Sequence, residues 1–209
     1  MTDSEHWARY YEVTVDRPAW PTIRFAIERF AAEPRAAGPD PEPPRFAVDL
    51  GCGAGRDARE LLTAGWRVLA VDREPGAIAA VEAATPPELR PALTGLVADL
   101  TDVEIPACDL VNASLCLPFL TPEPYWTTLA RILAALPVGG RFAALLFGDR
   151  DGSGTDPSMT CPSPDAIRAA LSGFEVEHWS EREEDTQTAL GEPHHLHLIE
   201  VAARRAVAG

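Results

Sequence analysis

From residue 45 onward, short apolar runs alternate with segments of helical spacing, and this alternation constrains the fold more than any other feature. The runs are too short for helices and end at turn-forming residues or aspartate, which indicates buried strands. We place strands at residues 45–50, 67–71, 93–98, 109–113, 142–147, 174–179 and 195–202. Such alternation predicts a doubly wound α/β fold with a mostly parallel sheet, closed by an antiparallel pair.

The helices and the domain plan follow from the same pattern. We expect one domain, residues 1–209, with an N-terminal helical cap (1–33), a Pro-rich loop (34–44) and the α/β core (45–209). The cap contains a helix over about 21–30, from its apolar spacing. The helix that starts at Thr121-Pro122 is expected to bury a stripe of Trp126, Leu129, Leu133 and Leu136.

Charge narrows the range of partners. The chain has 32 acidic and 18 basic residues, a formal net charge of -14. This field repels phosphate backbones and anionic lipid, so we expect neither nucleic acid nor a membrane as partner. The apolar runs are too short to cross a bilayer, no secretion signal is recognisable, and the four cysteines lack C-x-x-C spacing. We therefore expect free thiols and a cytoplasmic location. A separate expectation is that the protein is a monomer or a homodimer.

The residues that follow the strands indicate a ligand site, because parallel sheets bind ligands beyond the carboxyl ends of their strands. The first strand runs into Asp49-Leu-Gly51-Cys-Gly53-Ala-Gly55, a loop whose backbone can approach a ligand closely. Asp72 ends the second strand, where a carboxylate can accept both ribose hydroxyls. Asp99 ends the third and could accept an adenine amino group. The three strand ends together predict an adenosine site.

The spacing of the glycines separates two kinds of adenosine ligand. Dinucleotide enzymes carry G-x-G-x-x-G, whereas this loop reads G-x-G-x-G. Asp49, two residues before the first glycine, is unfavourable beside a pyrophosphate and suits an amino group. Both observations disfavour an NAD-linked oxidoreductase, which stays an alternative.

The segment Val48-Asp-Leu-Gly-Cys-Gly-Ala-Gly-Arg-Asp57 resembles motif I of the class I S-adenosylmethionine-dependent methyltransferases. The resemblance continues through Val71-Asp72, Ala98-Asp99-Leu100 and 109–113, and covers about residues 45–148. It implies a Rossmann-like sheet of seven strands in the order 3-2-1-4-5-7-6, with S-adenosylmethionine (SAM) as cofactor. The Asn/Asp-Pro-Pro-Tyr/Phe motif of nucleic-acid amino methyltransferases is replaced by Asn112-Ala-Ser-Leu-Cys-Leu-Pro118, so methylation of bases or glutamine by that device is not expected.

The resemblance also assigns roles within the cofactor site. Asp49 would orient the methionine amino group, Asp72 would hold the ribose, and Tyr11 would close over the cofactor. Arg73, Asp99 and Leu100 would surround the adenine, and Ser114 and Leu115 would line the sulfonium side. The full set is Tyr11, Asp49, Gly51, Cys52, Gly53, Gly55, Asp72, Arg73, Asp99, Leu100, Ser114 and Leu115.

The implied activity is methyl transfer to a small-molecule acceptor, mainly by apposition. Positioning can supply ~7–11 kcal/mol of a barrier. A general base typically accelerates a reaction by ~10²–10⁴-fold, which corresponds to only about 3–5 kcal/mol. Asp149 and His195 are the candidate bases, and the acidic run 181–185 is expected to be a solvated face beyond the sixth strand. The histidines 194, 195 and 197 lack the partners of a metal site, so no metal is expected. The other alternative is a catalytically idle SAM or nucleotide binder that acts through a partner.

Overall fold

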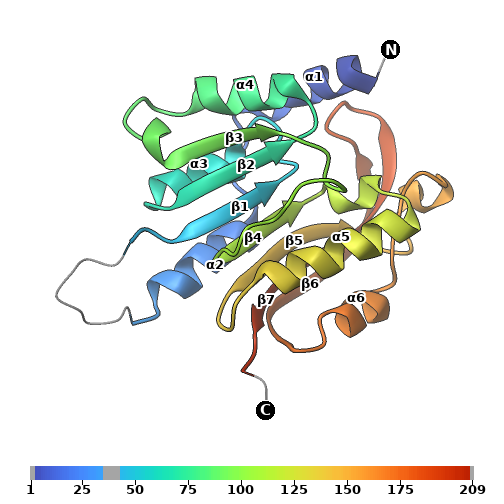
Figure 1. The fold of residues 1–209 in the computed structure, drawn as a ribbon. Helices are drawn as coiled ribbons and strands as arrows, with labels where there is room; N and C mark the ends of the chain where they lie inside the picture. Colours follow the sequence, from blue (N-terminus) through green and yellow to red (C-terminus); the bar gives the residue numbers. More distant parts are fainter. Residues whose placement is uncertain (1–2, 35–42, 208–209) are drawn as a thin grey trace.

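The computed structural model describes residues 3–34 and 43–207 of the 209-residue chain (Figure 1). Most of the predicted Pro-rich loop, residues 35–42, therefore lies outside the described residues. Among those that are described, no helix is both long enough and apolar enough to span a bilayer.

Seven strands form one sheet in the order β3-β2-β1-β4-β5-β7-β6, which confirms the predicted topology. β1 to β5 are parallel, and β7 is antiparallel to both β5 and β6. The strands are β1 (Phe46–Leu50), β2 (Arg67–Asp72), β3 (Leu93–Val97), β4 (Leu110–Ser114), β5 (Arg141–Phe147), β6 (Phe174–Gln187) and β7 (Pro193–Arg205).

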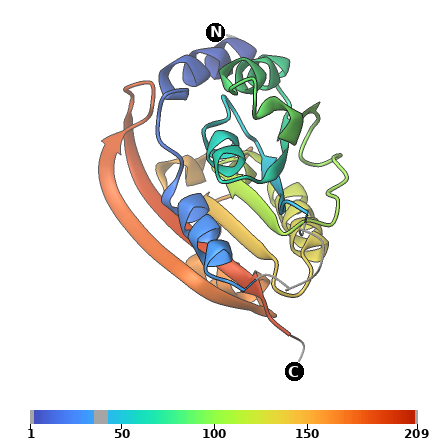
Figure 2. The ribbon, with the colours of Figure 1, turned by 90° about the vertical axis from the view of Figure 1, so that its left-hand side faces the viewer.

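Helices cover both faces of the sheet (Figures 1 and 2). The apolar sides of α2 (Pro21–Ala31), α3 (Arg56–Thr63) and α4 (Pro75–Ala84) share one core cluster with one face. On the other face, α5 (Pro122–Ala135) and α6 (Pro164–Ala170) enclose the second cluster. α1 (Asp3–Thr14) lies beside α4 at the carboxyl end of the sheet, so the N-terminal segment covers the edge where a ligand is expected.

The buried stripe of α5 differs from the predicted one by one residue. Tyr125 is fully buried, whereas Trp126, which we expected inside, is 36% exposed. Each residue advances an α-helix by about 100°, so a stripe through Leu129 and Ile132 passes through Tyr125 rather than Trp126. The prediction for Trp126 was therefore wrong, while Leu129, Leu133 and Leu136 are buried as expected.

The last two strands of the sheet are longer than predicted, and together they form a curved arm whose end extends past β5 (Figure 2). β6 continues through the acidic run, so residues 181–185 lie within the sixth strand and not beyond it. They pair with residues 195–199 of β7 and are mostly exposed. Their position within the strand corrects our prediction, and their exposure agrees with it.

Candidate functional site

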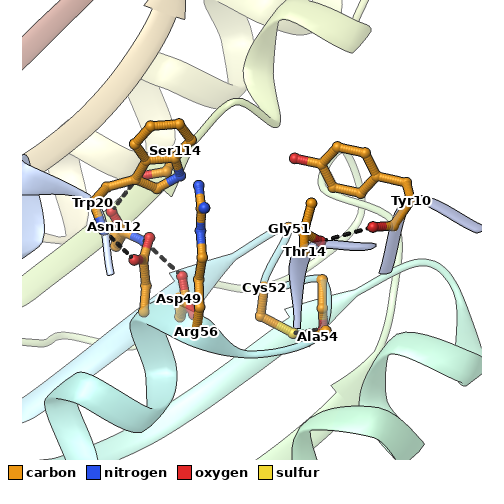
Figure 3. Close-up of a pocket in the computed structure, with 12 residues that line it drawn as sticks. Tyr10, Thr14, Trp20, Asp49, Gly51, Cys52, Ala54, Arg56, Asn112 and Ser114 are labelled. Carbon is orange, nitrogen blue, oxygen red and sulfur yellow. Dashed lines mark hydrogen bonds between the residues drawn. The ribbon is translucent and has the colours of Figure 1, made fainter. Parts of the chain in front are cut away.

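A pocket opens where β1 and β4 end, between the glycine loop and the N-terminal segment (Figure 3). Its walls include Asp49 and Asn112 from the strands, Arg56 from α3, and Tyr10 and Trp20 from the N-terminal segment. The space, part of it open to solvent, has a volume of about 420 Å³.

Two carboxyl groups and an amide form the floor of the pocket. The Asn112 amide nitrogen donates to Asp49 Oδ1 at 2.7 Å and to Asp57 Oδ2 at 3.0 Å. Asp57 also accepts the backbone N–H of Trp20, which ties the segment between α1 and α2 to this floor. Asp49 Oδ2 is buried and has no hydrogen-bond partner among the residues that the structure describes. Burial and the neighbouring Asp57 raise the pKa of Asp49 to about 8. A cation beside this oxygen would offset both effects and favour the ionised carboxylate, so the open oxygen suits a cationic hydrogen-bond donor.

Arg56, the first residue of α3, extends across the pocket in Figure 3. Its guanidinium lies 3.8 Å from the centre of the Trp20 ring, and burial lowers its pKa. Within the described ranges, no residue forms a hydrogen bond or ion pair with this guanidinium. Arginine donors at a helix N-terminus are suited to a carboxylate, so the pocket presents an anion-binding group near an open carboxyl oxygen.

Asp72 lies at the tip of β2, where Tyr11 covers it. Its carboxylate accepts the backbone N–H groups of Gly53 (2.9 Å) and Glu74 (3.0 Å) and lies 3.4 Å from the Tyr11 hydroxyl. Gly53 has a positive φ of 51°, and a Cβ built there would come within 3.3 Å of the Tyr11 ring. The fold thus brings together three of the predicted site residues, from α1, the glycine loop and β2.

The end of β3, where the adenine is predicted to bind, adjoins the tip of β2. The Ala98 N–H donates to the Asp72 backbone carbonyl at 3.0 Å, so the two strand tips adjoin. The Asp99 carboxylate accepts the N–H and hydroxyl of Thr101, and these hydrogen bonds lower its pKa. Arg73 is near the Trp7 ring, and Leu100 packs partly on the core. Oδ1 of Asp99 is therefore held by its own turn.

The glycine loop also meets the end of β4. Ser114 donates to Asn112 Oδ1, and Leu115 has a φ of 56°, the one positive value among non-glycine residues in the described chain. Strained backbone of this kind clusters at functional sites. Gly51 lies so close to Cys116 that a Cβ there would come within 2.3 Å of the cysteine Cβ.

The remaining loop residues have a packing explanation. Cys52 is buried, and burial raises the pKa of its thiol, which disfavours a nucleophilic role. Gly55 leaves room for Val81 of α4, because a Cβ there would lie 2.0 Å from a Val81 methyl carbon.

The two candidate bases lie away from the pocket. Asp149 is 3.6 Å from both Arg150 and His197, and its side chain is 43% exposed. His195 is exposed on the arm of β6 and β7, between Asp185 at 2.6 Å and Glu183 at 3.2 Å, and these hydrogen bonds raise its pKa. Neither residue lines the pocket, so their catalytic role stays a prediction.

Arg56, Asp57, Asn112 and Trp20 were not predicted as site residues, although the first two lie inside the quoted glycine motif. Their only signal in the sequence is proximity to that motif and to the end of the fourth strand. Their meeting in the pocket depends on contacts between residues 37 and 55 positions apart.

Comparisons with known proteins agree on the domain and the fold. Residues 47–140 match a family model described as a methyltransferase domain. TehB from Haemophilus influenzae is structurally similar, with a TM-score of 0.72 and 17% identity over 90% of this chain and 62% of TehB. The chain therefore spans less than two thirds of TehB. No curated protein matches the sequence.

Two further solved structures contain a bound cofactor or its product. The 1,6-didemethyltoxoflavin-N1-methyltransferase from Burkholderia thailandensis holds 1,6-didemethyltoxoflavin and S-adenosylhomocysteine (TM-score 0.58, 21% identity, 93% of this chain and 79% of that one). Magnesium protoporphyrin IX methyltransferase from Synechocystis PCC 6803 holds SAM (TM-score 0.63, 16% identity, 99% and 85%). At these identities the similarity shows a shared fold.

Proposed function

Because residues 47–140 match a family model described as a methyltransferase domain and the chain has the fold of the class I SAM-dependent methyltransferases, we propose that this protein transfers a methyl group from SAM to a small-molecule acceptor. The observation that carries the proposal is the buried Asp49 Oδ2 on the floor of the pocket, which has no hydrogen-bond partner in the described part of the chain. An ammonium group would give this oxygen the partner that it lacks.

The pocket fits the amino-acid end of SAM. Asp49 would accept a hydrogen bond from the amino group, and Arg56 would donate to the carboxylate. A dinucleotide would instead place its pyrophosphate near two carboxyl groups, Asp49 and Asp57. The arrangement of charge therefore favours SAM over NAD.

The ribose would bind at Asp72 and would replace the Tyr11 hydroxyl as the hydrogen-bond partner of its carboxylate. The contact between the Tyr11 hydroxyl and Asp72 is long, 3.4 Å, so it is a weak hydrogen bond that a ribose hydroxyl can replace. The Tyr11 ring, already against Gly53, would then cover the cofactor. These assignments extend the predicted roles of Asp49 and Asp72 and add Arg56.

When bound, SAM supplies an electrophilic methyl group on a positively charged sulfur. The residues of this chain would hold the cofactor at both ends, so that the methyl is presented beyond Ser114 and Leu115. α1 would exclude water on the side of Tyr10 and Tyr11. Much of the rate enhancement would come from this positioning, which requires no base for an acceptor that is already an anion.

Titration calorimetry with S-adenosylhomocysteine, SAM and NAD tests the proposal. We expect the first two to bind and NAD not to bind, and Arg56→Met to weaken S-adenosylhomocysteine more than Arg24→Met does, because Arg24 is exposed and pairs with Glu60 on the surface. Binding of NAD alone would refute the proposal. A protein that binds SAM but forms no S-adenosylhomocysteine with any acceptor would be the idle binder.

A further inference from the structure

A histidine–aspartate pair lies beyond the carboxyl end of β5, outside the pocket described above. His194 Nε2 lies 3.1 Å from Asp151 Oδ1, and the Asp151 side chain is fully buried. The same carboxylate accepts the backbone N–H groups of Ser153 and His197, both at 2.9 Å, so its orientation is fixed. His194 is 18% exposed, and its Nδ1 has no hydrogen-bond partner in the described part of the chain. A buried carboxylate that holds one imidazole nitrogen leaves the other free to accept a proton.

The neighbouring histidines do not have this arrangement. Both ring nitrogens of His195 are paired, with Asp185 and Glu183. His197 is completely buried, and its two nitrogens contact Arg150 and Glu181. Among the three histidines of β7, only His194 combines a buried carboxylate partner with a free nitrogen.

A row of aromatic rings connects this pair to the cofactor pocket. The His194 ring lies 6.0 Å from Phe147, which lies 6.5 Å from Phe119. The Phe119 ring is 5.0 Å from Trp7 of α1. Trp7 in turn stacks on Tyr11 at 6.3 Å, and Tyr11 contacts Asp72. The row is made by β7, β5, the turn after β4 and α1, so it runs along the edge where the acceptor must meet the methyl group.

Two features of the row point to its ligand. Phe119 is a large apolar residue, yet 39% of its surface is exposed at the edge of the sheet where the acceptor would bind. The indole nitrogen of Trp7 is buried and has no hydrogen-bond partner within residues 3–34 and 43–207. Ring faces with one unsatisfied donor match a flat aromatic compound that carries polar atoms.

We propose that the acceptor is a planar aromatic compound with a weakly acidic O–H or N–H group, that it binds along this row, and that His194 removes its proton. This inference rests on the proposed function. His194 Nδ1 takes the proton, and the acceptor's oxygen or nitrogen uses its electron pair to form the bond to the methyl carbon. The electron pair of the carbon–sulfur bond stays on sulfur, so a cation and a neutral acceptor give an imidazolium, a thioether and the methylated product.

The role of Asp151 is to position His194 and to stabilise its protonated form. Asp151 is the charged group with a contact to His194 in the described chain, and the residue opposite His194 on β6, Thr186, is uncharged. In the resting state the Nε2–H donates to Asp151, which leaves Nδ1 as the acceptor of the proton.

Binding of an aromatic probe tests the first half of the proposal without turnover. We expect 1-naphthol to bind to the complex with S-adenosylhomocysteine and to quench tryptophan fluorescence. Phe119→Ala should weaken this binding by about 2- to 10-fold, the range for aromatic contacts. Trp126→Ala is the matched control, because Trp126 is equally exposed but lies on α5 outside the row. Equal loss in both variants, or no binding of 1-naphthol, overturns the assigned acceptor class.

Turnover tests the second half. With SAM and either 1-naphthol or benzotriazole, His194→Gln should lower kcat by about 10²- to 10⁴-fold, with little change in probe affinity. It should also remove the acidic limb of the pH profile of kcat/KM. His178→Gln, a change on the neighbouring strand β6, is the control. An unchanged rate, loss of rate in His195→Gln instead, or no methylation of either probe refutes the inference. Failure to bind S-adenosylhomocysteine would instead refute the proposed function.

Discussion

At the scale of single residues, Asp49 couples the pocket to pH. Its pKa is raised by burial and by Asp57, to about 8. In the unfolded chain an aspartate has its ordinary pKa of ~3.9, so the folded state binds the proton more tightly. Where the native state binds more protons, stability falls as pH rises. The stabilising contribution of this group is therefore complete below about pH 4 and is lost as pH approaches 8.

We expect Asp49→Asn to reduce the pH dependence of the melting temperature of the ligand-free protein between pH 5 and 8. In the wild type this carboxyl makes the melting temperature fall across that window, whereas an amide has no proton to lose. Differential scanning calorimetry at several pH values measures the slope. Asp102→Asn is the control, because Asp102 is exposed. Identical slopes in the wild type and Asp49→Asn would show that Asp49 titrates normally.

The two strand-end aspartates at the adenosine side should differ in importance. Asp72 is 6% exposed and lies against the glycine loop, whereas Asp99 is exposed and its Oδ1 already accepts two hydrogen bonds from Thr101. Asp72→Ala should weaken S-adenosylhomocysteine binding by ~1.5–3 kcal/mol, the value of hydrogen bonds to a charged group. Asp99→Ala should weaken the binding of S-adenosylhomocysteine by a smaller free energy than Asp72→Ala. Calorimetric titration of both variants decides, and a larger loss in Asp99→Ala would place the ribose elsewhere.

At the scale of elements, a buried arginine joins α2 to the sheet. Arg141 of β5 is 1% exposed and donates to Glu177 of β6 at 2.6 Å and to Glu33, just beyond α2, at 2.7 Å. It also lies 4.3 Å from the centre of the Phe30 ring of α2. These contacts hold the end of α2 against β5 and β6.

Glu177→Ala should destabilise the fold by ~3–5 kcal/mol, because it leaves Arg141 buried with one partner fewer. Urea unfolding measures the change. The control is Glu60→Ala, which breaks the exposed pair with Arg24 and should cost at most ~1 kcal/mol. Similar costs in the two variants would mean that Glu33 alone satisfies Arg141.

The same elements show why the sequence predicts the parallel strands better than the arm. β1, β4 and β5 are buried on both faces, so they appear as apolar runs that end at turns. Beyond Ser180, β6 is exposed and charged, and no apolar period marks it as a strand. In α5 the helix was predictable, but Tyr125 and Trp126 are both aromatic, and composition alone does not decide which faces the core.

The candidate site likewise contains residues that the sequence predicts and residues that it does not. Asp49, Asp72 and the glycines are recognisable because they follow strands at fixed spacing. Arg56 and the pair of His194 and Asp151 depend on contacts across the fold, since His194 and Asp151 are 43 residues apart. The sequence contains His194 and Asp151, but nothing in it indicates that they lie in contact.

At the scale of the whole molecule, the net charge of -14 creates a negative field that acts on the cofactor. SAM carries one more positive charge than S-adenosylhomocysteine, because its sulfur is a sulfonium. The field should therefore favour SAM at low ionic strength, and salt should weaken SAM more than S-adenosylhomocysteine, since the Debye length falls from ~30 Å at 0.01 M to ~10 Å at 0.1 M.

The same screening should stabilise the ligand-free fold, because it reduces repulsion among the excess carboxylates. We expect sodium chloride to raise the melting temperature while the dissociation constant for SAM increases relative to that for S-adenosylhomocysteine. Both trends are measured on one protein sample by calorimetry from 0.01 to 0.1 M salt. If a global field acts on both, salt must raise the melting temperature of the ligand-free protein and lower its preference for SAM over S-adenosylhomocysteine. If the ratio of the two dissociation constants is constant, contacts inside the pocket alone set the preference for the charged sulfur, and the surface charge serves only solubility.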